Sequence, residues 1–217
     1  KLFTFKKLSK VLKKTGELFE SKKLYDNQVP NWISRVLQGK GHTITPKAAL
    51  MLVEFLGNDL GKVNNELEKL LLIIKPGEQI TPQIIERNIG ISKDFNNFEL
   101  QNALGAKDFK KAYRIITYFS QNPKDHPIVL TVALLYSFFS KLLKYHSLTN
   151  KSEAAKVLGV NPYFLKDYQQ AAGNYPMKKV SSIISVIRDV DLKSKGVGAS
   201  GLPQGDLLKE LLVGIFD

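Results

Sequence analysis

The stretch that most constrains the fold is residues 127–143, because apolar side chains occur on every side of the helix predicted there. Pro127 opens the helix in a position where proline is tolerated. Its apolar residues are Ile128, Leu130, Val132, Leu134, Leu135, Phe138, Phe139, Leu142 and Leu143. A helix without a polar face has to be covered by other elements. We therefore expect this helix at the centre of a helical bundle. Its longest apolar run, 128–135, is too short to span a bilayer, so no membrane segment is expected.

Helical patterns also surround this segment. Apolar residues in 98–104 end at Gly105, and a new helix begins at Asp108, with Phe109, Ala112, Tyr113, Ile116 and Phe119 at helical spacing. Further helices are predicted at 153–158, after Asn161-Pro162, from Pro176, and over 207–216. Residues 96–217 are thus predicted to form one helical domain.

Residues 26–95 are predicted to form a smaller helical domain. Thr45-Pro46 and Thr81-Pro82 each combine an N-cap with proline at the first helical position. The segment 60–74 has apolar residues at alternating spacings of three and four, which suits packing against a neighbouring helix. Residues 39–45 are predicted to be a turn.

Residues 1–25 are predicted to form a helix and a short strand at 17–20. This segment has too little apolar surface to fold alone, and the sequence has no initiator methionine. We therefore expect it to be the end of a larger domain. The alternative is a basic, frayed N-terminal arm.

The distribution of charge indicates an anionic partner. The net charge is +12, and residues 1–25 carry eight lysines against two glutamates, whereas residues 26–95 are neutral. A basic protein of this kind often binds nucleic acid, although the charge could simply aid solubility. There is no cysteine, which excludes disulfides and thiolate chemistry.

Little in the sequence indicates catalysis. The chain has no phosphate-binding G-x-x-x-x-G-K-[ST] string. His42, His126 and His146 are isolated from one another, so no metal site is predicted. Asp189 and Asp191 are two residues apart on one helix and do not face each other. We predict no catalytic residue, no metal ligand and no cofactor.

Five strings together resemble one family. They are VPNWISRVLQGKG (29–41), GNDLGKVNNELEKLLL (57–72), ITPQIIERNI (80–89), the stretch from Asn97 to Tyr145, and LGVNPYFLKDYQQAAGNYP (158–176). They resemble the delta subunit of the bacterial DNA polymerase III clamp loader. The resemblance implies an all-α chain with three parts: a remnant of an AAA+ core (1–25), a helical lid (26–95) and a helical collar for oligomerisation (96–217).

The resemblance also implies a function in DNA replication. The collar would join a pentameric loader with subunits of the gamma/tau and delta-prime type, and other subunits would bind the ATP. The loader opens the sliding clamp, which the AAA+ core upstream of this segment would contact, and places it on primer–template DNA in the cytoplasm. The chain would be part of the DNA polymerase III holoenzyme and would have no catalytic activity of its own.

The candidate DNA-phosphate contacts are Lys193, Lys195, Lys178 and Lys179. The first two lie in the predicted flexible run 193–201, whose glycines would expose backbone amides. An ordinary mobile surface loop is the alternative. Some members of the family place an aromatic residue against DNA here, whereas this chain has Lys195-Gly196-Val197. Lys178 and Lys179 begin the preceding helix, where cations oppose the helix dipole.

Two other classes of protein remain open. One is a sequence-specific helical DNA-binding regulator, with a helix-turn-helix around Leu158-Gly159. The other is an enzyme whose active site combines residues far apart in the sequence. The polar stretch 92–97 is predicted to be a hinge between the two helical domains, crossed by few contacts.

Overall fold

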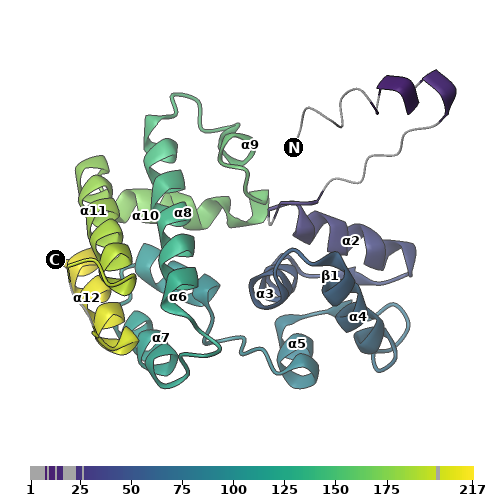
Figure 1. Cartoon of the computed structure of the whole chain (residues 1–217), viewed down its shortest axis with the longest axis horizontal. Helices are drawn as coiled ribbons and strands as arrows, with labels where there is room; N and C mark the ends of the chain where they lie inside the picture. Colours follow the sequence, from purple (N-terminus) through teal and green to yellow (C-terminus); the bar gives the residue numbers. More distant parts are fainter. Residues whose placement is uncertain (1–7, 9, 13, 17–22, 26, 199–200) are drawn as a thin grey trace.

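The computed structural model describes residues 8, 10–12, 14–16, 23–25, 27–198 and 201–217. The strand predicted at 17–20 lies outside the described residues, as does most of the helix predicted before it. Helices are nearly all of the regular secondary structure in the described residues, with only two short strands beside them, which confirms the predicted fold class. It forms two bundles that lie beside each other (Figure 1).

The N-terminal bundle comprises α2 (Val29–Gly39), α3 (Pro46–Leu56), α4 (Leu60–Leu71) and α5 (Pro82–Ile89). Its core is formed mainly by aliphatic residues of these helices, including Ile33, Leu37, Leu52, Leu67 and Ile85. Capping side chains set the start of α3, α4 and α5: Thr45 accepts from Ala48 N, Asp59 from Gly61 N, and Thr81 from Ile84 N.

This bundle also contains two short strands that the sequence analysis missed. Strand β1 (Thr43–Ile44) pairs in parallel with β2 (Gln79–Ile80), so that Thr43 lies opposite Gln79. The predicted turn at 39–45 is therefore wrong in its second half. The pairing joins the segments that precede α3 and α5, and two residues are too few to show a strand periodicity.

The C-terminal bundle begins with α6 (Asn97–Gly105), α7 (Phe109–Gln121) and the long α8 (Ile128–Ser147). The short α9 (Ala154–Leu158) and a 3₁₀ turn, η1 (Pro162–Phe164), lead to α10 (Leu165–Asn174). The chain closes with α11 (Met177–Ser194) and α12 (Gln204–Phe216). In Figure 1, α8 runs through this bundle, with α11 and α12 on the side away from the N-terminal bundle.

Helix α8 is central, but it is not covered on all sides as predicted. Leu135, Phe138 and Phe139 are buried in the core, and α8 packs against α11, α10 and α6. Val129 and Tyr136, in contrast, are 52% and 53% exposed. Leu130, Leu134 and Lys141, on another part of the α8 surface, line the space between the two bundles, so the neighbouring helices do not surround α8 completely.

By length and hydropathy alone, α8 could cross a membrane, since it has 20 residues and a mean hydropathy of 1.5 over its most apolar window. The expectation of no membrane segment was based only on the length of the run 128–135, whereas the whole helix is long and apolar enough to meet this criterion. Its buried aromatic residues pack within the C-terminal bundle, as expected for a core helix.

The junction between the bundles contains two buried asparagines that make several hydrogen bonds. Asn96 and Asn97 are 2% and 4% exposed, and Asn96 Oδ1 caps α6 through Glu99 N. The carboxylate of Glu54, on α3, accepts hydrogen bonds from Asn97 N and Asn97 Nδ2. Hydrogen bonds of the 92–97 stretch reach Glu86 and Glu54 of the N-terminal bundle, and hinge motion there stays a prediction.

Candidate functional site

The four lysines predicted to contact DNA do not lie together. Lys178 and Lys179 are in the first turn of α11, whereas Lys193 is in its last turn and Lys195 is its C-cap. At 1.5 Å per residue, the two pairs are separated by about 22 Å along the helix axis. A DNA molecule contacted by all four lysines would therefore be contacted at two separate places.

Lys193 and Lys195 also have partners within the chain. The Lys193 ammonium pairs with Glu210 on α12, and the Lys195 ammonium lies 2.6 Å from Asp191. The prediction that Lys193 lies in a flexible loop is wrong, since it belongs to α11. Each cation is partly neutralised, which reduces its attraction for a phosphate.

The loop after α11 has several residues with positive φ angles, and all of them are glycines. Gly196, Gly198 and Gly201 have φ angles of 84°, 75° and 80°, a region that favours glycine. Val197 is 57% exposed at the tip. Residues 199 and 200 lie outside the described part of the chain.

An exposed aromatic patch joins α7 and α12. Phe109 lies against Phe216 with ring centroids 5.2 Å apart, and against Tyr113 at 6.1 Å. Phe109 and Tyr113 are each 46% exposed, and Val213 nearby on α12 is 52% exposed. We call these four residues, Phe109, Tyr113, Val213 and Phe216, the α7–α12 patch. Phe109 and Tyr113 have the helical spacing predicted from the sequence, but both side chains are half exposed rather than buried.

A charged triad connects the two bundles. Glu99 on α6 is bound by Lys111 of α7 and by Lys47 of α3, whose ammonium lies 2.5 Å away. Burial alone would raise the pKa of Glu99, but the hydrogen bonds and charges of the two lysines outweigh it and lower that pKa. Because Lys47 belongs to one bundle and Glu99 to the other, the triad fixes their contact.

A cleft of about 1000 Å³ lies between the bundles. Its wall on one side is the less covered face of α8, including Leu130 and Leu134, and Arg35, Lys141 and Lys156 bring positive charge to it. Burial, and then the charge of Lys144, lowers the pKa of Lys141. The cleft was not predicted, because it requires the relative placement of two bundles.

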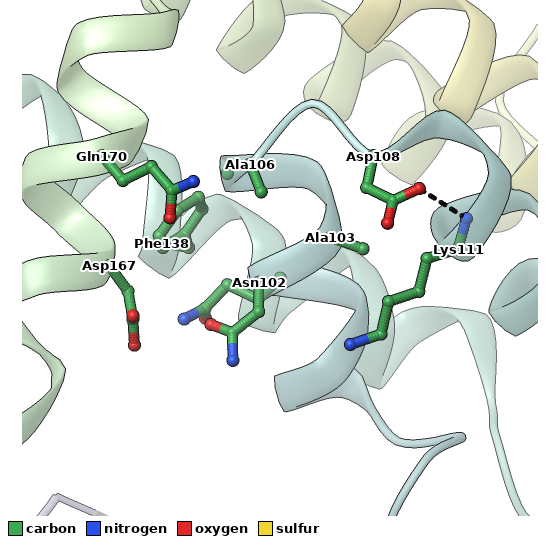
Figure 2. A pocket seen from close by; sticks show the side chains of 10 residues that line it. Asn102, Ala103, Ala106, Asp108, Lys111, Phe138, Asp167 and Gln170 are labelled. Atoms are coloured by element: carbon green, nitrogen blue, oxygen red, sulfur yellow. Dashed lines mark hydrogen bonds between the residues drawn. The ribbon is translucent and has the colours of Figure 1, made fainter.

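A smaller pocket of about 200 Å³ lies between α6 and α10 (Figure 2). Asn102 of α6 faces Asp167 and Gln170 of α10, and the ring of Phe138 forms part of the wall. Burial raises the pKa of Asp167, and Lys166 offsets only part of this effect.

The sequence matches the family described as DNA polymerase III delta subunit, C-terminal domain, over residues 94–211, which is more than half of the chain. The chain belongs to the DNA polymerase III delta subunit family. The matched region contains the whole C-terminal bundle except the end of α12. The resemblance drawn from the sequence motifs is thereby confirmed.

Two relatives extend this similarity over the N-terminal bundle. The chain is 26% identical over 217 residues to DNA polymerase III subunit delta of Bacillus subtilis (strain 168), which covers 98% of this chain and 61% of that protein. A solved structure titled Bacillus subtilis DNA clamp loader delta protein matches with a TM-score of 0.57 and 22% identity, over 97% of this chain and 62% of that one. Because the solved structure is only 22% identical to this chain, this match shows similarity of fold alone. The chain spans about three fifths of the length of both relatives.

Neither comparison supports a sequence-specific DNA-binding regulator. The short helices around Gly159 are also poorly suited to read DNA, since α9 has only five residues and Tyr168 and Ala171 of α10 point into the core. In this delta-family chain, all three histidines make internal contacts: His42 Nδ1 lies 3.3 Å from Glu78 O, His126 stacks on Phe119 at 4.1 Å, and His146 Nε2 lies 2.8 Å from Tyr175 O.

Proposed function

We propose that the two bundles are the lid and the collar of a clamp-loader subunit, and that the collar joins this chain to the other subunits of the loader. In this proposal the lid covers residues 26–95 and the collar residues 96–217. The partners are loader subunits of the gamma/tau and delta-prime type, in the cytoplasm. The loader as a whole opens the sliding clamp and places it on primer–template DNA.

The family match carries the proposal, and the α7–α12 patch supports the part played by the collar. The relatives are named DNA polymerase III subunit delta and DNA clamp loader delta protein. The α7–α12 patch presents two half-exposed aromatic rings and Val213 to solvent, although the same helices bury a large core. Aromatic residues are enriched in protein–protein interfaces, where burying them stabilises the complex.

The proposal assigns no catalysis to this chain. ATP binding and hydrolysis belong to other loader subunits, and contact with the sliding clamp belongs to the AAA+ core that precedes the lid in the family. The chain would contribute to the DNA polymerase III holoenzyme by holding subunits in place.

The test is reconstitution of the loader from its separate subunits. Tyr113→Glu together with Val213→Glu places two charges in the α7–α12 patch without touching the core. We expect this double variant to remain folded but to fail to enter the loader complex, measured by size-exclusion chromatography with light scattering.

The matched control is Tyr163→Glu, since Tyr163 is 54% exposed but lies in η1, away from α7 and α12. This variant should assemble normally. Normal assembly of the double variant would show that the α7–α12 patch is not a subunit contact. Failure of the unaltered chain to join any loader subunit would refute the proposed function itself.

A further inference from the structure

One wall of the cleft between the bundles is a stripe of α8 that solvent can reach. The stripe consists of residues spaced three or four apart along the helix, which therefore lie on one side of it: Leu130, Ala133, Leu134, Ser137 and Lys141. Leu130 is 36% exposed, Ala133 is exposed, and the other three are partly exposed. In contrast to the core side of α8, this stripe is accessible to another molecule.

The opposite wall belongs to the N-terminal bundle. Asn31, Ser34 and Arg35 of α2 are exposed there, and Leu50 of α3 is partly exposed. Helix α3 packs against α6, and Phe98 of α6 lines the cleft between the two walls. The cleft is therefore a groove flanked by helices. Its volume of about 1000 Å³ admits several side chains at once.

The positive charge of this groove has no acidic partner. In the part of the chain that the structure describes, the ammonium groups of Lys141 and Lys156 form no ion pair. Arg35 adds a third cation on the opposite wall. Among the described lining residues, Glu54 is the one acidic side chain, and its Oε1 already accepts from Asn97. A partly buried charge without a partner is unfavourable, so a carboxylate entering the groove would be attracted.

We propose that this groove binds an acidic amphipathic helix of another protein. The apolar face of that helix would lie against Leu130 and Leu134, and its carboxylates would pair with Lys141, Lys156 and Arg35. An amphipathic helix binds a groove in this way through apolar side chains three and four residues apart. The proposal does not depend on a role in clamp loading.

Charge disfavours two other occupants that the chain itself could supply. Residues 1–25 carry eight lysines against two glutamates, so the three cations of the groove would repel this segment. A second copy of the chain has a net charge of +12 and would be repelled as well.

Nucleic acid has the right charge but the wrong partners in this groove. Single-stranded nucleic acid binds by stacking its bases on accessible aromatic rings. Phe138, Phe164 and Tyr168 line the groove, but they are only 2%, 7% and 4% exposed. The accessible stripe of α8 offers aliphatic side chains instead. An acidic protein segment therefore fits the groove better than nucleic acid does.

The probe is a fluorescent synthetic helix of about twelve residues, or three turns, with leucine on one face and glutamate on the other. It would be titrated with the 217-residue chain while its fluorescence anisotropy is followed. We expect saturable binding. A peptide with lysine in place of every glutamate should not bind. A scrambled peptide of the same composition, without an apolar face, should bind at least about ten-fold more weakly, because it loses its apolar contacts.

Reversal of the groove charge gives the sharpest test. Arg35→Glu together with Lys156→Glu should weaken binding of the acidic peptide by at least about ten-fold, because two attractions become repulsions. The same variant should bind the lysine peptide better than the parent does. The control is Lys110→Glu together with Lys209→Glu, which changes the net charge equally on α7 and α12, outside the groove. This control should bind the acidic peptide nearly as the parent does.

Two neighbouring residues of α8 test the apolar contact. Leu130→Gln should weaken binding of the acidic peptide by about five-fold, because apolar surface is lost from the groove. Val129→Gln is the matched control and should leave binding unchanged, since Val129 is 52% exposed but does not line the groove. The absence of saturable binding, or an equal loss in the charge-reversed variant and its control, would overturn the proposal. So would displacement of the peptide by single-stranded DNA that is equally sensitive to Leu130→Gln, because the groove would then bind nucleic acid.

Discussion

The carboxylate oxygen Oε1 of Glu54, in the N-terminal bundle, lies 2.7 Å from the backbone nitrogen of Asn97 and 2.9 Å from its Nδ2, in the first turn of the C-terminal bundle. One acceptor therefore holds both the backbone and the side chain of the first residue of α6. The first N–H groups of a helix have no partner within the helix, so Glu54 also acts as a cap supplied from the other bundle.

We predict that Glu54→Ala destabilises the chain by about 1–3 kcal/mol, because the buried Asn97 N–H loses its acceptor. Glu54→Gln retains an oxygen that can accept from Asn97 and should cost less. The free energy of unfolding in urea would measure both variants. Glu68→Ala is a suitable control: Glu68 forms only an exposed ion pair with Lys40, and its loss should cost less than about 1 kcal/mol. Equal effects of Glu54→Ala and Glu68→Ala would contradict a role for Glu54 in joining the bundles.

Glu54 and Glu99 should affect stability in opposite directions as the pH changes. The lysines lower the pKa of Glu99 below 4.5 in the folded chain. Its contribution to stability is therefore present above pH 4.5 and is lost as the pH falls through the folded pKa. Burial raises the pKa of Glu54, although its hydrogen bonds with Asn97 and Phe98 oppose the shift. Its favourable contribution is therefore present below pH 4.5 and is lost as the pH rises through the folded pKa.

We predict that Glu99→Gln removes part of the loss of stability that the parent shows on acidification below pH 4.5. Glu54→Gln should instead remove part of the loss on the alkaline side of that pH. Urea unfolding at a series of pH values would give both profiles, with the parent as reference. If both substitutions change the same side of the profile, at least one of the two pKa directions is wrong.

The outcome for particular residues shows which parts of this fold can be read from the sequence. Thr45, Thr81 and Asp108 mark helix starts correctly, because an N-cap acts on amides only two or three residues away. Gly159 ends α9 in the left-handed conformation for a similarly local reason.

The relations across the fold could not be predicted in this way. Lys47, Glu99 and Lys111 come from three helices, and their meeting depends on how two bundles pack. Phe109 and Tyr113 have the helical spacing of core residues, yet they are exposed, because periodicity identifies an apolar face but not what covers it. The resemblance to the delta family came from motifs, whereas the α6–α10 pocket came only from the structure.

A comparison of two neighbouring residues tests the placement of α8. Leu135 is 1% exposed within the core, whereas Tyr136 is 53% exposed. Leu135→Asp would bury a charge without a partner, and we predict a loss of roughly 4 kcal/mol or more in the free energy of unfolding. Tyr136→Asp should change it by less than about 0.5 kcal/mol. Thermal or urea unfolding of the two variants would decide, and a Leu135→Asp chain as stable as the parent would show that α8 is not central.

The predicted contact of Lys193 with DNA can be tested by changing its ion-pair partner as well as the lysine itself. Lys193 pairs with Glu210, so the carboxylate competes with any phosphate for the same ammonium. In a reconstituted loader, Lys193→Ala should weaken binding of primer–template DNA and reduce the slope of log affinity against log salt by up to about 0.9.

Adding Lys195→Ala should reduce the slope further, to a total of up to about 1.8, since each phosphate contact releases its own counterion.

Glu210→Gln should instead raise the affinity for DNA, because it frees the Lys193 ammonium and removes a negative charge. The effect should fade at high salt, where charges more than a few ångströms apart are screened. If the Lys193–Glu210 pair only stabilises the packing of α11 on α12, both single substitutions should lower stability and leave DNA affinity unchanged. DNA affinity at several salt concentrations, measured together with thermal unfolding of each variant, separates the two roles by the sign of the Glu210→Gln effect.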